Sequence, residues 1–146
     1  MSASPRLPTT AQIGTDIVYI PRIAAVVEQF GQHFLDKVYT PQEQQDAKRS
    51  ARQINSRLAG RWAAKEAAVK ALGTGWRGVG YRDVEIKRKP SGAPTITLHN
   101  RALALVHTRH QENWEWQVSF SHDGDYAIAT AIFAPSVDSL SSSTPI

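Results

Sequence analysis

The sequence predicts an α+β fold in which helices pack on an antiparallel sheet. Residues 58–72 form the densest helix-forming run in the chain. Near the C-terminus, the alternating segment 114–121 and the apolar segment 126–134 flank the turn His122-Asp123-Gly124-Asp125, so two antiparallel strands are expected there. The predicted order is a strand, helices, a strand pair, a helix and a second strand pair, which is typical of this fold class.

The first element is predicted to be a strand that carries an acid. Residues 12–20 alternate as a strand does, with Asp16 on the same face as Val18. A carboxylate among apolar residues is unfavourable unless it is paired or binds a cation. The alternative is a residue that reaches water at the end of the strand.

Two segments before the central run carry helix signals. A proline-led amphipathic pattern predicts a helix over 21–29, broken by Gly31. The capping-box residues Thr40-Pro41-Gln42-Glu43 predict a second helix that runs to about residue 49. The segment 33–39 between them is expected to be a loop or a helical turn.

The central run combines an apolar stripe with ionisable residues. On a helical wheel the stripe contains Leu58, Trp62, Val69 and Leu72. Lys65 falls inside the stripe and Glu66 at its edge, while Lys70 lies one turn beyond Glu66. An ordinary salt bridge between Glu66 and Lys70 is therefore one interpretation of this spacing. Gly73-Thr74-Gly75 is expected to end the helix and to form a loop whose backbone can approach a phosphate closely.

The second half of the chain is predicted to contain four strands and a helix. Strands are expected within 81–89 and over 95–98, joined by a turn rich in proline and glycine. Asn100 is expected to cap a helix over 101–111. The last strand, 126–134, is nearly all apolar and is expected to be buried on both faces.

Length and composition predict one globular domain of ordinary hydrophobicity. With 146 residues, 41% hydrophobic, the chain is long enough for a core. We expect a flexible N-terminal extension over 1–12, a domain over 13–134 and a disordered, serine-rich tail over 135–146. The extension does not resemble a secretory signal.

Charge and cysteine content restrict the function. The chain has no cysteine, which excludes disulfides and thiolate chemistry and fits a cytoplasmic protein. No apolar run is long enough to span a membrane. A net charge of +4 suits a phosphate-bearing ligand or an acidic partner, and neither this charge nor any motif indicates nucleic-acid binding.

Asp16 and Glu66 together are candidates for a Mg²⁺ site. Mg²⁺ prefers one or two carboxylates, completed by waters and substrate phosphates. Five basic residues and no acid lie between positions 48 and 61, which favours an anion nearby: Lys48, Arg49, Arg52, Arg57 and Arg61. Zinc is not indicated, because only His107 and His110 have ligand-like spacing and no further partner follows. No serine-nucleophile motif is present.

Several motifs occur together in a recognisable order. They are Ile13-Gly14-Thr15-Asp16-Ile17, Thr40-Pro41-x-Glu43, the run 58–67, Lys70-Ala71-Leu72-Gly73-Thr74-Gly75, Gly92-Ala93-Pro94, Val118-Ser119-Phe120-Ser121-His122 and Tyr126-Ala127-Ile128-Ala129. In this order and spacing the chain closely resembles the holo-[acyl-carrier-protein] synthase family, within the 4′-phosphopantetheinyl transferase superfamily. The resemblance covers residues 13–134 and implies that superfamily's fold.

The resemblance implies a transferase. The 4′-phosphopantetheine arm of coenzyme A would pass to a serine of apo acyl carrier protein, with release of adenosine 3′,5′-bisphosphate, in support of fatty acid biosynthesis. By similarity Asp16 and Glu66 hold Mg²⁺, Lys70 contacts the phosphates, Lys65 is a further candidate phosphate ligand, and Gly73-Thr74-Gly75 lies along the coenzyme. Glu66, a metal-bound water or Lys70 are all candidates for the group that deprotonates the serine.

The nucleotide end of coenzyme A is implied to meet a second group of residues. Ser121 and His122 would contact the nucleotide, with His122 near the 3′-phosphate. Arg61 and Arg52 would add positive charge there.

The resemblance also implies partners. An acidic acyl carrier protein would dock on the first helix, where Arg22 is the candidate contact, although this helix then offers Glu28 and Gln29 rather than a run of arginines. The family's short form is commonly a homotrimer with active sites between subunits. The alternative function is a non-catalytic member of the same fold that binds coenzyme A or a carrier protein. The sequence does not distinguish a fatty-acid carrier from a polyketide carrier.

Overall fold

The computed structural model describes residues 11–110 and 113–136. Its elements are β1 (Gln12–Tyr19), α1 (Ile20–Phe30), α2 (Gln32–Val38), α3 (Pro41–Ala47), the short 3₁₀ helix η1 (Ala51–Gln53), α4 (Ile54–Leu72), the 3₁₀ helix η2 (Tyr81–Asp83), β2 (Val84–Arg88), β3 (Pro94–Leu98), α5 (Asn100–Arg109), β4 (Trp114–Asp123) and β5 (Tyr126–Pro135). The predicted extension and tail lie almost entirely outside the described residues. At their inner edges, Gln12 begins β1 and Pro135 ends β5.

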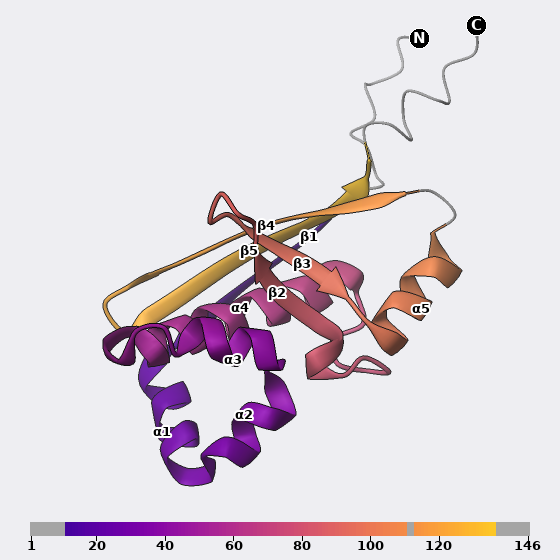
Figure 1. The fold of residues 1–146 in the computed structure, drawn as a ribbon. Helices are drawn as coiled ribbons and strands as arrows, with labels where there is room; N and C mark the ends of the chain where they lie inside the picture. The colour runs from indigo at the N-terminus through magenta and orange to yellow at the C-terminus, as the bar shows by residue number, and fades with distance from the viewer. Residues whose placement is uncertain (1–10, 111–112, 137–146) are drawn as a thin grey trace, which may run out of the picture.

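The predicted fold class is confirmed. A three-stranded antiparallel sheet has the order β1-β5-β4, and β2 and β3 form a separate antiparallel hairpin. The long helix α4 runs along the sheet, while α1, α2 and α3 gather at one end of it (Figure 1). No helix in the described part of the chain has the length and apolar character that a bilayer span requires.

Small residues let α4 lie very close to the sheet. Ala63, Ala64, Ala67 and Ala68 of α4 are buried, as are Ala127, Ala129 and Ala131 of β5. Gly14 of β1 makes the tightest approach, because a Cβ at this position would lie 1.9 Å from the Ala67 carbonyl oxygen. Asp16 comes two residues later on the same face, so this contact also determines where Asp16 lies relative to α4.

The prediction that β5 is buried on both faces was wrong. Ala127, Ala129, Ala131 and Phe133 are buried on one face, but Tyr126 and Ile128 are half exposed on the opposite face. Ile13 and Ile17 of the neighbouring strand β1 share that outer face and are also exposed. Helices cover only one face of this sheet, which leaves an apolar surface on the other; we call Ile13, Ile17, Tyr126 and Ile128 the outer sheet face.

Helix boundaries differ from the predictions in three places. Residues 32–38, expected to be a loop or a turn, form the helix α2. Helix α4 begins four residues before the predicted run, at Ile54. Asn100 does not cap α5: it is the first residue of the helix, with φ of 48°, and His99 occupies the cap position.

Two predicted helix ends are confirmed. The Thr40 side chain accepts from the Glu43 backbone, and the Glu43 carboxylate accepts from the Thr40 backbone, as a capping box requires. Gly73 ends α4 in the left-handed conformation, with φ of 76°.

Candidate active site

Asp16 and Glu66 line one pocket. Asp16 comes from the middle of β1 and Glu66 from α4, and together they border a cavity of about 400 Å³. Apolar side chains form much of its wall: Ile17, Val18, Ile23, Val26, Phe34 and Trp62. Arg22, exposed on α1, lies at the same pocket. Two carboxylates that are 50 residues apart in the sequence therefore border one partly apolar hollow.

Lys70 pairs with Asp16, not with Glu66. Its ammonium lies 3.0 Å from Asp16 Oδ1 and donates a second hydrogen bond to the Thr15 carbonyl oxygen at 3.0 Å. Glu66 accepts a hydrogen bond from the indole nitrogen of Trp76 instead, at 3.0 Å. The salt bridge that the helical spacing allowed is therefore not formed, and Asp16, Lys70 and Glu66 remain next to one another as separate groups.

The protein supplies at most two carboxylates to a cation at this pocket. No group of three or more histidine, cysteine, aspartate or glutamate side chains suited to a metal occurs among residues 11–110 and 113–136. A cation held by Asp16 and Glu66 would need oxygens from a bound ligand and from water, which is the pattern that Mg²⁺ prefers.

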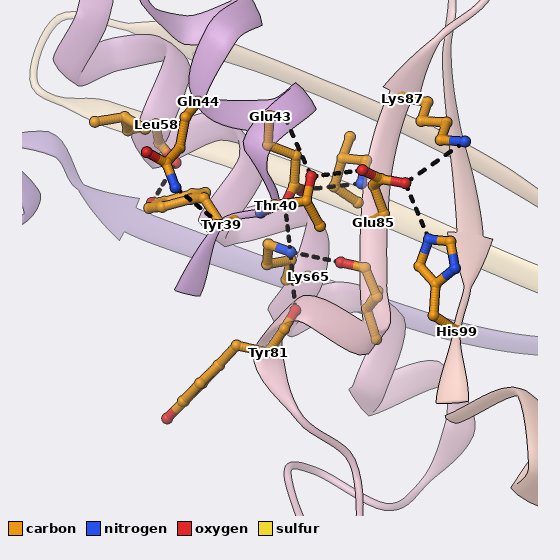
Figure 2. A network of polar contacts seen from close by, with 12 residues as sticks. Tyr39, Thr40, Glu43, Gln44, Leu58, Lys65, Tyr81, Glu85, Lys87 and His99 are labelled. Atoms are coloured by element: carbon orange, nitrogen blue, oxygen red, sulfur yellow. Dashed lines mark hydrogen bonds and ion pairs between the residues drawn. The ribbon is translucent and has the colours of Figure 1, made fainter. Parts of the chain in front are cut away.

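Lys65 does not face a ligand. Its side chain is 0% exposed, and its ammonium binds three oxygens: Glu43 Oε1 at 2.9 Å, the Tyr81 carbonyl at 2.9 Å and the Val84 carbonyl. Figure 2 shows this ammonium between α3, α4 and the start of β2. Burial lowers the pKa of Lys65, and the Glu43 carboxylate opposes that shift. The prediction that Lys65 contacts phosphate is therefore corrected: it is a core residue that ties α4 to three other elements, α3, η2 and β2.

The Lys65 contact continues into a network of buried polar groups (Figure 2). Glu43 also accepts from the backbone N–H of Ile86, and the Thr40 hydroxyl donates to Glu85. Glu85 in turn lies 2.9 Å from His99 Nε2. Burial raises the pKa of Glu85, but the hydrogen bonds from Thr40 and His99 outweigh it and leave the pKa below its ordinary value.

Ser121 and His122 line a second pocket. It has a volume of about 370 Å³ and lies between the start of α4 and the end of β4. Arg57, Arg61 and Arg88 line it as well, so the structure brings Arg61 to the same pocket as Ser121 and His122. Arg88 comes from the hairpin strand β2, and its guanidinium lies 5.6 Å from the centre of the Phe120 ring. Its position could not be inferred from sequence spacing, because it depends on how the hairpin packs.

The Arg61 guanidinium is suited to an anion in this second pocket. It is 2% exposed, and its Nε has no hydrogen-bond partner within the described residues. Asp46 is 3.9 Å away, and the Arg57 carbonyl accepts one hydrogen bond from Nη1. Burial and the nearby Arg88 lower the pKa of Arg61. A buried cation with a spare donor would gain from a bound anion.

Arg52 and the glycine loop occupy more exposed positions. Arg52 lies on η1, next to Gln53, which lines the second pocket. Gly73, Thr74 and Gly75 follow the end of α4, and both glycines have positive φ and open space around them.

Within one chain the two groups of predicted residues are separate. Asp16 and Glu66 line the first pocket, Lys70 adjoins it through its ion pair with Asp16, and no described residue lines both pockets. We call them the carboxylate pocket and the arginine pocket.

Comparisons with known proteins agree on one family. The family described as the 4′-phosphopantetheinyl transferase superfamily matches residues 12–131. The holo-[acyl-carrier-protein] synthase of Gloeobacter violaceus is 57% identical over 119 residues, which is 82% of this chain and 89% of that protein.

Solved structures give the same result. The holo-[acyl-carrier-protein] synthase of Neisseria meningitidis superposes with a TM-score of 0.75 at 32% identity, covering 84% of this chain and 96% of that one. The Helicobacter pylori enzyme, crystallised in complex with coenzyme A, superposes with a TM-score of 0.72 at 33% identity, covering 84% of this chain and 99% of that one.

Proposed function

The chain belongs to the 4′-phosphopantetheinyl transferase superfamily as a holo-[acyl-carrier-protein] synthase, and on that premise we propose how its two pockets carry out the transfer. The phosphopantetheine arm of coenzyme A passes to a serine of an acyl carrier protein, and adenosine 3′,5′-bisphosphate leaves. The observation that carries this proposal is that Asp16 and Glu66 line one pocket and that the Lys70 ammonium lies 3.0 Å from Asp16 Oδ1.

Mg²⁺ fits the carboxylate pocket. Asp16 and Glu66 are the two carboxylates that would hold it, and the pyrophosphate oxygens of coenzyme A would complete its coordination. When bound, Mg²⁺ supplies positive charge that stabilises the charge developing on the phosphate oxygens. Catalysis in phosphoryl-type transfers depends mainly on such positioning and charge stabilisation.

Lys70 supports the same step. In the structure its ammonium is held by Asp16 and the Thr15 carbonyl, and about half of its side chain is exposed. It can therefore turn to a pyrophosphate oxygen while its stem stays on α4. A mobile ammonium beside a cation site is a suitable phosphate contact.

The arginine pocket is the proposed site for the nucleotide 3′-phosphate. Arg61 offers a buried Nε donor that has no hydrogen-bond partner in the described part of the chain, and Arg57, Arg88 and His122 border the same space. Arginine side chains bind phosphate through paired hydrogen bonds. Arg52, Ser121 and the loop from Gly73 to Gly75 are proposed to contact the remainder of the coenzyme.

Self-association would join the two pockets, and we propose that the protein is a homotrimer. The outer sheet face exposes Ile13, Ile17, Tyr126 and Ile128, each of them half exposed or more. A contiguous apolar surface of this kind is typical of an interface between subunits. An active site shared between subunits would bring the carboxylate pocket of one copy to the arginine pocket of another. Light scattering should give three times the chain mass.

The carrier protein is proposed to dock at α1. Arg22 is exposed there and lies beside the carboxylate pocket, so an acidic carrier would bring its serine close to Asp16 and Glu66. Arg22→Glu should raise KM for the carrier more than KM for coenzyme A, because only the carrier meets α1. Equal increases in both constants would reject this docking site. A cytoplasmic location and a role in fatty acid biosynthesis go with this proposal.

One assay tests the proposed function. Apo acyl carrier protein, coenzyme A and Mg²⁺ are mixed with the protein, and the carrier is weighed by mass spectrometry. A gain of one phosphopantetheine group is expected, and it should disappear with Asp16→Ala or Glu66→Ala while circular dichroism stays unchanged. A protein that binds coenzyme A but never modifies any apo carrier would be the non-catalytic alternative.

A further inference from the structure

Trp76 holds Glu66 in a way that neither the family motifs nor the pocket residues explain. Its indole Nε1 donates to Glu66 Oε1 at 3.0 Å, and both side chains are partly buried. We propose that Trp76 is a positioning residue that orients the Glu66 carboxylate for cation binding. This inference rests on the proposed function, since it assumes that Glu66 is a metal ligand.

A neutral donor suits this task better than a cation. An indole N–H makes one directed hydrogen bond and carries no charge, so it fixes a carboxylate oxygen without neutralising it. Lys70 could have formed an ion pair with Glu66 but is directed to Asp16. Among the described residues no cation lies within ion-pair distance of Glu66, and its charge is left for a metal ion.

The position of Trp76 is itself restrained by aromatic packing. Its ring lies 4.5 Å from the Tyr81 ring, and Tyr81 stacks on Trp62 at 5.4 Å. Trp62 is part of the wall of the carboxylate pocket. The indole is therefore fixed by a stack that begins at the pocket wall, which gives the Glu66 hydrogen bond a defined direction.

The loop after α4 makes this contact possible. Trp76 follows Glu66 by ten residues, yet its side chain reaches back to the helix. Gly73 and Gly75 have φ of 76° and 54°, conformations that glycine adopts readily and that reverse the chain here. The glycine loop thus has a second role besides any contact with coenzyme: it returns Trp76 to the metal ligand.

The first test compares two matched variants. Trp76→Phe keeps an aromatic ring on Tyr81 and removes the N–H, whereas Tyr81→Phe alters the same stack and keeps the N–H. Partners that orient a metal ligand typically contribute 10–100-fold to metal affinity. Mn²⁺ affinity, measured by electron paramagnetic resonance with coenzyme A present, should fall about 10-fold in Trp76→Phe and remain near the original value in Tyr81→Phe. Thermal melting of each variant shows whether it is folded.

Three results would overturn the inference. Unchanged Mn²⁺ affinity in Trp76→Phe would show that the hydrogen bond does not matter. Equal losses in Trp76→Phe and Tyr81→Phe would show that only ring packing matters. If Glu66→Gln also binds Mn²⁺ normally, the proposed metal site itself is wrong, so failure of the proposed function is distinguished from failure of the Trp76 inference alone.

A second test uses only the unmodified protein. In ¹H–¹⁵N spectra of the unmodified protein with coenzyme A, Mg²⁺ should shift the indole N–H signal of Trp76 more than those of Trp62, Trp114 and Trp116. The acceptor of the Trp76 hydrogen bond becomes a metal ligand, which changes its charge density. Mg²⁺ binding that leaves the Trp76 signal fixed would also overturn the inference.

Discussion

Replacing Lys65 by methionine should reduce stability strongly, because the change isolates a buried carboxylate. Lys65 and Glu43 are both 0% exposed, and the ammonium lies 2.9 Å from Glu43 Oε1. In Lys65→Met the apolar stem is retained and the charge is lost. Glu43 would keep hydrogen bonds from the backbone N–H groups of Thr40 and Ile86 but would have no counter-charge.

The size of the effect follows from the burial of both partners. Removing one member of a buried ion pair costs about 3–5 kcal/mol. This is a large part of the roughly 5–15 kcal/mol that stabilises a typical domain.

Urea unfolding followed by tryptophan fluorescence measures these differences, at one fixed chain concentration because an oligomer's stability depends on it. Lys37→Met, at an exposed site on α2, is the matched control and should change stability by less than about 0.5 kcal/mol. Adding Glu43→Gln to Lys65→Met should recover part of the loss, because the unpaired charge is gone. The reasoning is refuted if Lys65→Met keeps its stability and instead raises KM for coenzyme A, as a phosphate ligand would.

Two further predictions concern the contact of β1 with α4 and the buried polar network around Lys65. Gly14→Ala places a Cβ 1.9 Å from the Ala67 carbonyl oxygen, so β1 must move away from α4. Urea unfolding should show that the free energy of unfolding falls by about 1–3 kcal/mol, and turnover should fall as well. Unchanged stability and turnover would contradict the close-contact argument. The pKa of Glu85 is lowered below its usual 4.5, since the hydrogen bonds from Thr40 and His99 outweigh the effect of burial. Its contribution to stability should therefore be complete above that pH and be lost as pH falls through the lowered value. Glu85→Gln should reduce this loss of stability at acid pH, measured by urea unfolding at several pH values. An unchanged loss would show that other groups cause it.

Local signals allowed much of the fold to be predicted. Alternation located β4, a capping box located the start of α3, and Gly73 marked the end of α4. Each signal acts over a few residues, through side-chain period or a backbone hydrogen bond. These local conformations persist in the folded protein because the tertiary packing favours the same conformations.

Long-range packing decided what the local signals left open. The α4 pattern predicted Lys65 in an apolar stripe but not its partner, because Glu43 lies 22 residues earlier on another helix. It was also compatible with a Glu66–Lys70 salt bridge, whereas Asp16, brought close by β1, takes Lys70. The apolar composition of β5 predicted burial on two faces, yet helices cover only one.

The sequence alone determined the fold class, most of the helices and strands and, through its motifs, the family. Those motifs also give the predicted site residues Asp16, Glu66, Lys70, Ser121 and His122. Only the tertiary structure decided which charged groups meet: Lys65 in the core with Glu43, Lys70 beside Asp16, and Trp76 on Glu66. The physical reason is that the energy of a buried or partly buried charge depends on the partner within a few ångströms. Spacing along one helix places its side chains on a face but does not show what packs against that face.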